Sequence, residues 1–409
     1  MHFRHPIATV CLAAASLLST VSVASATIAI TTPNSAVSTT FQGMSQNGIG
    51  RSAFPAVSFG TFRMWDDGTR WSQIETSRGS YNWSQADKVV NLVRGNGKDL
   101  IYTFGGTPTW ASASPTQGCL YGNGSCAAPH SMSDLSTFAK ALATRYKGRI
   151  KYYELWNEPN DLQFYKGSMA SMLTMAQTIH DAIKSVDSSA VILSPCATWS
   201  TAGSPTVWMN SFLNGGGGSH FDVASYHAYS GSSAPEFIVN SVQGMRNTLN
   251  SHGYGSMEIF ITEGGWGQNK YASTEDLRAN FVARYMILAW AKGVSKMVWY
   301  AYDSNSWGTL FTSSGGLRPA GVAYGQVGKW LTGATMRGCN QDSNGTWVCA
   351  LTRANGYSAQ IIWNPSKTTG YSVSSGLPRK HTLTGVISTT GSYVTVGPKP
   401  VLVENKAGF

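Results

Sequence analysis

Residues 152–185, with the sequence YYELWNEPNDLQFYKGSMASMLTMAQTIHDAIKS, contain the pattern that decides the fold. The stretch opens with a short apolar run, Tyr152–Trp156, which is typical of a buried parallel strand. Asn157, the carboxylate of Glu158 and Pro159 follow this run. Ser168–Ser185 then has the apolar spacing of an amphipathic helix. This part of the chain therefore predicts one β-strand followed by one α-helix.

The same unit recurs along the chain. Seven further apolar runs are predicted as strands: Phe41–Met44, Thr61–Trp65, Leu100–Phe104, Val191–Ser194, Asp222–His227, Ile259–Thr262 and Met297–Ala301. Helices are predicted at Ser84–Arg94, Ser133–Tyr146, Thr206–Leu213, Pro235–Ser251, Thr274–Ala291 and Ala320–Leu331. The first unit lacks a clear helix, because residues 45–60 show little helical periodicity.

Eight such repeats predict an α/β fold, a (β/α)8 TIM barrel over residues 41–335. A doubly wound sheet is the alternative. No Gly-rich phosphate-binding loop follows any of the predicted strands, which argues against the nucleotide-binding form of that fold.

Residues 1–26 have the features of a secretory signal peptide. A basic start precedes a mostly apolar run over residues 7–23, and Ala24-Ser25-Ala26 matches the small-residue cleavage pattern. No other stretch approaches the ~18 apolar residues of a membrane span. We therefore expect a secreted protein that begins near Thr27 and has no membrane contact after cleavage.

The chain changes in character after residue 335. Short strand-like runs alternate there with turn residues, at Trp347–Leu351, Ser358–Trp363, Gly370–Val373, Tyr393–Val396 and Val401–Val403. Residues 336–409 therefore predict a small antiparallel, β-sandwich-like accessory domain. The N-terminal segment, residues 27–40, could add a strand to it.

The charge and the cysteines exclude several classes of function. The net charge is +10, but the 30 basic residues are scattered and form no cluster of the kind that binds nucleic acid. A basic balance instead allows attraction to an acidic polysaccharide. Cys119 with Cys126 and Cys339 with Cys349 are predicted as local disulfides, which leaves Cys196 as a buried thiol. No C-x-x-C pair is present, so no metal site is expected.

Two predicted strands end in a carboxylate. The fourth ends in Glu-Leu-Trp-Asn-Glu-Pro-Asn (154–160) and the seventh in Thr-Glu-Gly-Gly-Trp (262–266). Active sites of such barrels lie at the carboxyl ends of the strands, and strands four and seven face each other across that mouth. Glu158 and Glu263 could therefore flank one bond, as a general acid and a nucleophile must in retaining glycoside hydrolysis.

These motifs resemble the paired signatures of clan A glycoside hydrolases. Trp156-Asn157-Glu158-Pro159-Asn160 is similar to the clan's acid/base motif, and Thr262-Glu263-Gly264 to its nucleophile motif. Within the clan, the chain most resembles glycoside hydrolase family 39, over roughly residues 41–335. Phe164-Tyr165-Lys166-Gly167, Thr107–Ser112 and Gly79–Trp83 support that resemblance.

The resemblance implies a role for each motif residue. Glu158 is the expected acid/base, Glu263 the nucleophile, and Asn157 a donor to the sugar 2-hydroxyl. Tyr229 is expected to orient the nucleophile and His227 to contact the sugar. Trp299, which ends the eighth strand, is expected to lie under the sugar as an aromatic platform.

Some residues keep two interpretations at this point. Arg63 could hold Glu263 ionised, or it could pair with Glu154 inside the barrel. Asp66 and Asp67 could contact a sugar or cap a loop. His227 could instead be a core histidine. Trp65, Trp110 and Trp266 could be sugar platforms or packing residues, and Trp266 is the preferred sugar contact.

The sequence thus predicts a retaining hydrolase that cleaves a β-linked oligo- or polysaccharide, endo-acting, by double displacement and without a metal or organic cofactor. An exo-acting β-glycosidase, similar to the β-xylosidases of family 39, is the first alternative. A non-catalytic polysaccharide-binding protein would be expected to lack Glu158 or Glu263. A polysaccharide lyase would need a base beside an arginine or metal clamp, and no such cluster stands out.

Overall fold

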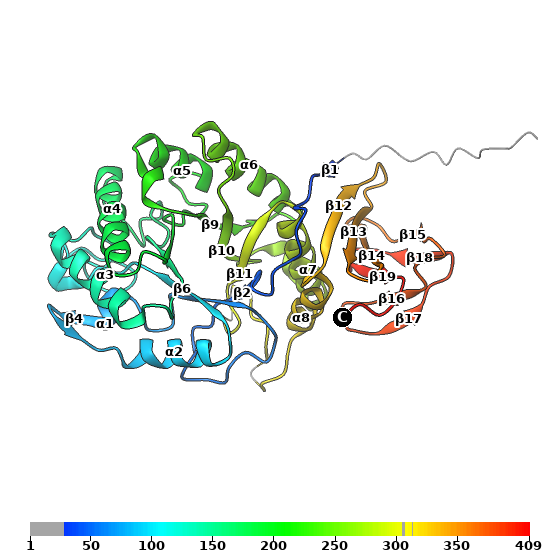
Figure 1. The fold of residues 1–409 in the computed structure, drawn as a ribbon, viewed down its shortest axis with the longest axis horizontal. Helices are drawn as coiled ribbons and strands as arrows, with labels where there is room; N and C mark the ends of the chain where they lie inside the picture. Colours follow the sequence, from blue (N-terminus) through cyan, green and yellow to red (C-terminus); the bar gives the residue numbers. More distant parts are fainter. Residues whose placement is uncertain (1–27, 305–306, 313) are drawn as a thin grey trace, which may run out of the picture.

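Eight parallel strands form the centre of the larger part of the molecule (Figure 1). The computed structural model describes residues 28–304, 307–312 and 314–409, so the predicted signal peptide lies outside the described residues. The eight strands are β2 (Gln42–Met44), β3 (Thr61–Met64), β6 (Asp99–Thr103), β7 (Tyr152–Glu154), β8 (Val191–Leu193), β9 (Ala224–Tyr229), β10 (Ile259–Gly265) and β11 (Val294–Trp299).

The strands close into a barrel. Hydrogen-bonded neighbours follow the order β8-β7-β6-β3-β2-β11-β10-β9, and every pairing in this series is parallel. Parallel bridges from Leu193 to Val223 and from Ala197 to Tyr226 join the two ends of the series. The predicted (β/α)8 barrel is therefore confirmed.

Helices surround the barrel in the predicted alternation (Figure 1). They are the short α1 (Trp71–Ile74), α2 (Ser84–Gly95), α3 (Met132–Tyr146), α4 (Met169–Val186), α5 (Pro205–Asn214), α6 (Phe237–Ser251), α7 (Glu275–Ala291) and α8 (Pro319–Leu331). No helix lies in residues 45–60, all of which the structure describes. Minor elements are β4 (Glu75–Ser77), β5 (Ser80–Tyr81), and the 3-10 turns η1 (Thr109–Ala111), η2 (Gly217–His220) and η3 (Lys270–Ala272).

A C-terminal antiparallel domain packs beside the barrel. Its main sheet has the order β1-β12-β13-β14-β19-β16-β17, and β15 pairs with β18 in a second, two-stranded sheet. The strands are β1 (Ile28–Ile30), β12 (Thr335–Gln341), β13 (Trp347–Arg353), β14 (Tyr357–Trp363), β15 (Thr369–Ser372), β16 (Arg379–His381), β17 (Ile387–Thr389), β18 (Tyr393–Val396) and β19 (Val401–Glu404). A small apolar core that includes Ile362, Val394 and Val403 joins the two sheets.

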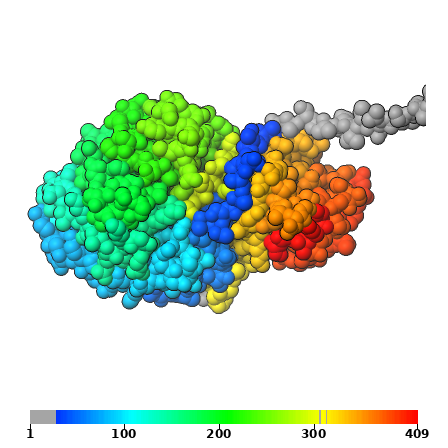
Figure 2. Space-filling view, viewed as in Figure 1, coloured from blue at the N-terminus to red at the C-terminus, as the bar shows by residue number. Residues whose placement is uncertain are grey.

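The N-terminal segment and two side chains connect the parts. β1 pairs with β12 at the edge of the main sheet, and the blue segment in Figure 2 runs over the junction. Trp363 Nε1 of β14 donates to Glu236 Oε1 beside α6 at 3.1 Å, and Arg284 of α7 lies 3.2 Å from the same oxygen. The C-terminal domain is thus attached to the helices that follow β9 and β10.

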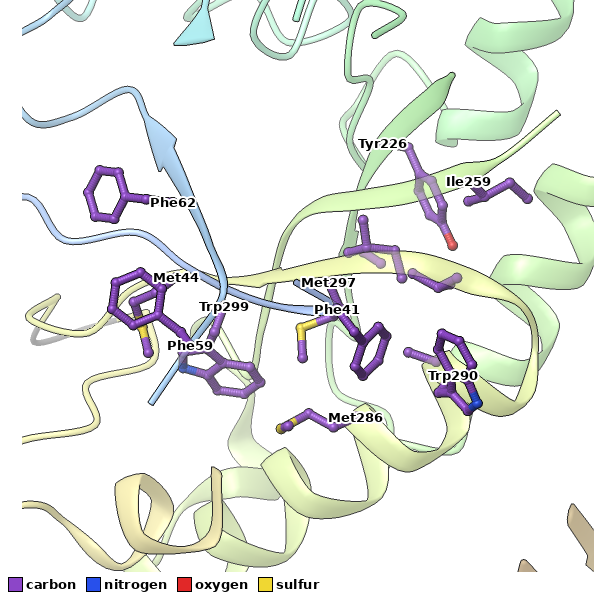
Figure 3. Close-up of a cluster of buried hydrophobic side chains, with 14 of the residues drawn as sticks. Phe41, Met44, Phe59, Phe62, Tyr226, Ile259, Met286, Trp290, Met297 and Trp299 are labelled. Atoms are coloured by element: carbon purple, nitrogen blue, oxygen red, sulfur yellow. The ribbon is translucent and has the colours of Figure 1, made fainter. Parts of the chain in front are cut away.

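Two apolar cores hold the barrel. Between the strands and α7, Phe41 and Trp290 meet edge to face with 5.2 Å between ring centroids, and Figure 3 shows them with Met286 and Met297. Inside the barrel, a separate cluster consists of Ile101, Tyr152, Leu193, Val223, Phe260 and Val298. Side chains alternate along a strand, so Thr103 and Glu154, two residues beyond Ile101 and Tyr152, also point into the barrel, closer to its C-terminal mouth.

Both predicted disulfides are present, between Cys119 and Cys126 and between Cys339 and Cys349. Cys196 is a buried free thiol, as expected. Among the described residues, no helix has the length and apolar character needed to cross a membrane.

Candidate active site

Arg63, at the end of β3, connects the inward side chains of the C-terminal mouth. Its Nε donates to Glu154 Oε2 at 2.8 Å, and its two terminal nitrogens donate to Glu263 Oε1 at 2.5 Å and to Asn157 Oδ1 at 2.8 Å. The side chain of Arg63 is wholly buried. The guanidinium therefore makes both contacts that the sequence left as alternatives, one with Glu154 and one with Glu263.

Glu154 is the deep member of this network and is entirely buried. Burial opposes its ionisation, but the charge of Arg63 prevails and the pKa of Glu154 is lowered. The Thr103 hydroxyl donates to the same carboxylate at 2.9 Å. Glu154 is thus an ionised partner inside the barrel and does not line the cleft described below.

Glu158 and Glu263 lie close together on the cleft side of the side chains that Arg63 connects. One oxygen of each carboxyl group and one ring nitrogen of His227 all lie within 4.8 Å of one another. His227 Nδ1 is 2.7 Å from Glu158 Oε1 and 3.4 Å from Glu263 Oε2. Tyr229 donates its hydroxyl hydrogen to Glu263 Oε2 at 2.8 Å. β7, β9 and β10 thus bring together four residues that the sequence singled out.

The backbone at Glu158 turns sharply where β7 stops. Glu158 has a φ of 40°, in the left-handed region that non-glycine residues rarely adopt. Its backbone N–H donates to the Cys196 carbonyl oxygen at 3.1 Å, so the neighbouring chain holds this conformation. Strained backbone of this kind persists where surrounding contacts over-determine it, often at functional sites.

The two carboxyl groups differ in their electrostatics. Burial raises the pKa of Glu158 to about 8, and the charge of Asp161 adds to that rise. Burial also raises the pKa of Glu263, but the charge of Arg63 and the hydrogen bond from Tyr229 counteract the rise. Glu263 is held by the Arg63 cation at 2.5 Å, whereas no lysine or arginine among the described residues forms an ion pair with Glu158. Near neutral pH, Glu158 therefore retains a proton, and Arg63 favours the ionised form of Glu263.

His227 is neutral in the same environment. Burial lowers its pKa to about 4, although the charge of Glu263 opposes that shift. The ring is wholly buried and does not line the cleft, so it lies beneath the carboxyl groups.

A cleft of about 1150 Å³ opens over these groups. Glu158 and Glu263 are in its wall, together with Asn157, Tyr229 and Trp266. Arg63 holds the Asn157 oxygen, which leaves the amide nitrogen of Asn157 as a donor. The cavity is large enough for several sugar rings and has the mixed apolar and polar lining of ligand sites.

Two predicted sugar platforms lie away from the cleft. Trp299 is wholly buried, packs 5.3 Å from Trp266 between ring centroids, and donates from Nε1 to the Gly308 carbonyl oxygen at 2.7 Å. Trp110 donates to the Glu75 carbonyl oxygen at 2.9 Å. Neither side chain is part of the cleft wall, because both indoles are packed within the fold.

Other aromatic side chains line the cleft that the sequence analysis did not select. Tyr121, on the disulfide loop, and Tyr300, after β11, both donate to Asp66, at 2.7 and 2.6 Å. Trp199 and Trp307 also line the cleft and are 58% and 38% exposed. The position of Tyr300 directly after β11 was an available signal, whereas the loop positions of the others carried none.

The two aspartates after β3 differ from each other. Asp66 lines the cleft and also accepts from Arg70 at 2.9 Å, so its carboxylate holds three loops together. Asp67 is buried and accepts a short hydrogen bond from Thr69. Asp67 is therefore a loop cap.

Two groups of side chains have the composition and spacing of metal ligands. They are Glu154, Cys196 and His227, and Glu158, His227 and Glu263. Arg63 contacts members of both groups, with Cys196 Sγ at 3.4 Å and Glu263 at 2.5 Å. A divalent cation there would lie beside a fixed positive charge, which electrostatics disfavours.

Comparison with known proteins agrees with this geometry. The model of the cellulase family, glycosyl hydrolase family 5, matches residues 57–305. A 93-residue segment is 29% identical to endo-1,4-β-xylanase 3 of Hypocrea jecorina, over 23% of this chain and 25% of that protein. The chain thus matches about a quarter of the length of this curated relative.

Solved structures share the fold. A family 39 glycoside hydrolase from Bacteroides cellulosilyticus WH2 is 18% identical with a TM-score of 0.67, over 85% of this chain and 75% of that one. A family 39 β-xylosidase from Caulobacter crescentus is 15% identical with a TM-score of 0.67, over 92% and 97%. CelM2, a bifunctional glucanase-xylanase from a metagenome library, is 12% identical with a TM-score of 0.59, over 90% and 96%.

The family model covers more than half of the chain, and the clan A resemblance of the two glutamate motifs agrees with it. The chain belongs to the cellulase family, glycosyl hydrolase family 5, one of the retaining O-glycosyl hydrolase families of clan A.

Proposed function

We propose that this protein is a secreted retaining glycoside hydrolase that cleaves internal β-glycosidic bonds of a polysaccharide. One observation carries the proposal: two carboxyl groups, with one oxygen of each within 4.8 Å of the other, face a cleft of about 1150 Å³, and one of the two groups has a pKa of about 8. Retaining enzymes hold their carboxyl groups about 5–5.5 Å apart, and inverting enzymes about 6.5–9.5 Å. The short separation supports retention.

In the first step, the Glu263 carboxylate attacks the anomeric carbon. The bond from that carbon to the leaving oxygen breaks, and Glu158 gives its proton to the oxygen. Arg63 and Tyr229, at 2.5 and 2.8 Å, keep the Glu263 oxygens ionised and oriented. The Asn157 amide is positioned to donate to the sugar 2-hydroxyl, and Trp266 to contact the sugar ring.

In the second step, Glu158 acts as a base. It takes a proton from water, the water oxygen attacks the anomeric carbon, and the ester bond to Glu263 breaks. His227, which is neutral and 2.7 Å from Glu158, keeps that carboxyl group oriented in both proton states.

The substrate class follows from the relatives. The curated relative is named as an endo-1,4-β-xylanase, and the solved neighbours include a β-xylosidase and a glucanase-xylanase. We therefore propose a β-linked xylan or glucan. The resemblance to family 39 stays a prediction, because the family model that matches the chain is that of family 5. Residues 1–26 and the two disulfides support secretion.

Exo action is the second candidate, and the Asp66 group favours it. Tyr121 and Tyr300 both bind Asp66 at the cleft wall, which ties three loops together there. If these loops close the cleft beyond one sugar, only terminal residues are released.

Product analysis tests the proposal. Wild type, Glu158→Gln and Glu263→Gln are incubated with xylan, carboxymethylcellulose and xyloglucan, and the products are sized by mass spectrometry. We expect mixed oligosaccharides from wild type and almost none from either variant, with the β-anomer formed first by NMR. Single sugars alone would indicate the exo enzyme. Equal activity of wild type and both variants would refute the catalytic pair.

A further inference from the structure

Trp199 is an exposed tryptophan in the cleft, next to the catalytic pair. The indole is 58% exposed and lines the cleft that contains Glu158. It directly follows Thr198, which lines the same cleft and counteracts part of the rise in the pKa of the Glu158 carboxyl group. Single exposed apolar residues are common on protein surfaces. Trp199 differs from such residues because it lies in the same cleft wall as Glu158, the proposed proton donor.

The loop that carries Trp199 is held in place by Asn160. The Thr198 backbone N–H donates to Asn160 Oδ1 at 2.9 Å, and Asn160 Nδ2 donates to the Thr198 carbonyl oxygen at 2.7 Å. Ser200 donates to the Asn160 carbonyl oxygen at 2.8 Å. Asn160 itself is buried. The residues on both sides of Trp199 are therefore fixed, which reduces the entropy lost when a ligand binds the indole.

Polar side chains line the same cleft as Trp199. They are Ser232 and Ser233, in the loop after β9, and Asn240 of α6. A pyranose ring has apolar C–H faces and a polar rim of hydroxyl groups. A cleft that combines a flat indole with hydroxyl and amide groups matches that distribution.

The reaction chemistry indicates on which side of the scissile bond Trp199 would bind a sugar. Glu158 protonates the leaving oxygen, so the sugar beyond that oxygen lies on the Glu158 side of the cleft. We infer that Trp199 is the binding platform for the sugar on the leaving-group side, and that Asn160 is its positioning residue. This inference rests on the proposed hydrolase function.

The same site receives the acceptor when a sugar replaces water in the second step. The acceptor hydroxyl oxygen then bonds to the anomeric carbon, its proton goes to Glu158, and the ester bond to Glu263 breaks. The ratio of transfer to hydrolysis therefore reports occupancy of this site. It is independent of how much enzyme is folded, because both products come from the same glycosyl-enzyme.

The experiment compares wild type, Trp199→Ala, Trp199→Phe and Tyr393→Ala. Tyr393 is an exposed aromatic residue of β18 in the C-terminal domain and serves as the control. Xylohexaose and cellohexaose are the substrates, and xylobiose and cellobiose are the added acceptors. For Trp199→Ala, we expect a KM about tenfold higher and a similar fall in the transfer ratio. Trp199→Phe should recover part of both, and Tyr393→Ala should match wild type.

Asn160→Ala tests the positioning role. We expect it to lower the transfer ratio, and to have no further effect in a Trp199→Ala background, because both changes then act on one interaction. A wild-type KM and transfer ratio in Trp199→Ala would overturn the inference while leaving the hydrolase intact. Failure of wild type to cut any glycan, with Glu158→Gln alike, would instead overturn the proposed function and this inference together.

Discussion

The two ends of the barrel interior are built from the same strands but differ in their side chains: the N-terminal end is mainly apolar, with one buried lysine, Lys296, and the C-terminal mouth is charged. The N-terminal half contains six apolar residues, among them Tyr152 and Phe260 with 5.4 Å between ring centroids. The C-terminal mouth contains Arg63 in contact with both Glu154 and Glu263. One end stabilises the fold by excluding water. The other must offset the free energy cost of buried charge with hydrogen bonds.

Burial in the C-terminal mouth explains the proton on Glu158. Arg63 is the cation that contacts both Glu154 and Glu263, whereas Glu158 lies farther along the mouth beside His227, which is neutral because its pKa is about 4. Burial opposes the ionisation of Glu158, the charge of Asp161 adds to that effect, and the carboxyl group keeps its proton to a pKa of about 8. The same burial that makes a charge costly for stability supplies the acid for the reaction.

The largest expected effect is a difference in activity between two substitutions on the same strand, β10, one at each end of the barrel interior. Glu263→Gln should lower kcat/KM by about 10⁴-fold or more, because the amide cannot form the glycosyl-enzyme. Phe260→Leu, three residues earlier on β10, should leave kcat/KM within about twofold and lower the free energy of unfolding by roughly 1–2 kcal/mol. Kinetics and urea unfolding of both variants measure this. A large loss of activity in Phe260→Leu would erase the distinction between the ends.

Arg63 should be the residue whose loss destabilises the charged end most. Arg63→Met leaves Glu154 and Glu263 buried without their cation, at a cost of about 3–5 kcal/mol in the free energy of unfolding. The control is Arg145→Met, which breaks a half-exposed pair with Asp87 and should cost about 1 kcal/mol or less. Chemical denaturation compares the two. Equal costs would mean that the buried network contributes no more than a surface pair.

The pH dependence of activity tests the proton states. Since catalysis needs protonated Glu158, kcat/KM should fall tenfold per pH unit above an apparent pKa of about 8. The acidic limb should lie above the ordinary glutamate pKa, because burial raises the pKa of Glu263. With a 2,4-dinitrophenyl glycoside, which needs no acid, the alkaline limb of the glycosylation step should disappear. An alkaline limb that persists would assign it to another group.

Glu158→Gln should stabilise the protein at alkaline pH. The folded pKa of Glu158 lies above the unfolded value, so wild type loses stability as pH rises from about 4.5 to about 8. The variant lacks this loss and should be more stable by roughly 1–3 kcal/mol at pH 8, with little difference near pH 4. Thermal unfolding across this range measures it, with the surface variant Asp181→Asn as the control. A pH-independent difference would contradict the assignment.

The smallest effect is expected at the apolar end. Lys296 is buried there, with Thr40 Oγ1 at 2.6 Å and Asp99 at 3.4 Å, and burial lowers its pKa to about 8. A lowered lysine pKa costs stability below pH 8, and that cost disappears as pH rises above the unfolded value. Lys296→Met removes this cost but also the contacts with Thr40 and Asp99, and because the two effects oppose each other the free energy of unfolding should change by about 1 kcal/mol or less at pH 7. A loss of several kcal/mol would show that the lysine is an essential cap.

Local patterns predicted the elements better than they predicted contacts. The eight strands of the barrel coincide with eight apolar runs, because burial on both faces of a parallel strand leaves a short continuous run in the sequence. β12, β16 and β17 were missed. β12 and β16 alternate or mix polar residues, and all three residues of β17 are exposed. Half-exposed strands leave weak signals, since their pairing comes from neighbours far along the chain.

The sequence by itself determined that two carboxylates end opposite strands of a barrel, because alternation and strand order are local properties repeated eight times. The tertiary structure alone decided which side chains meet. Arg63 lies 200 residues from Glu263, and no local pattern encodes their contact. It also decided that Trp299 is buried while Trp199 faces the cleft. Loop direction depends on long-range hydrogen bonds, such as those from Asn160 to the loop after β8, which form only once the barrel has closed.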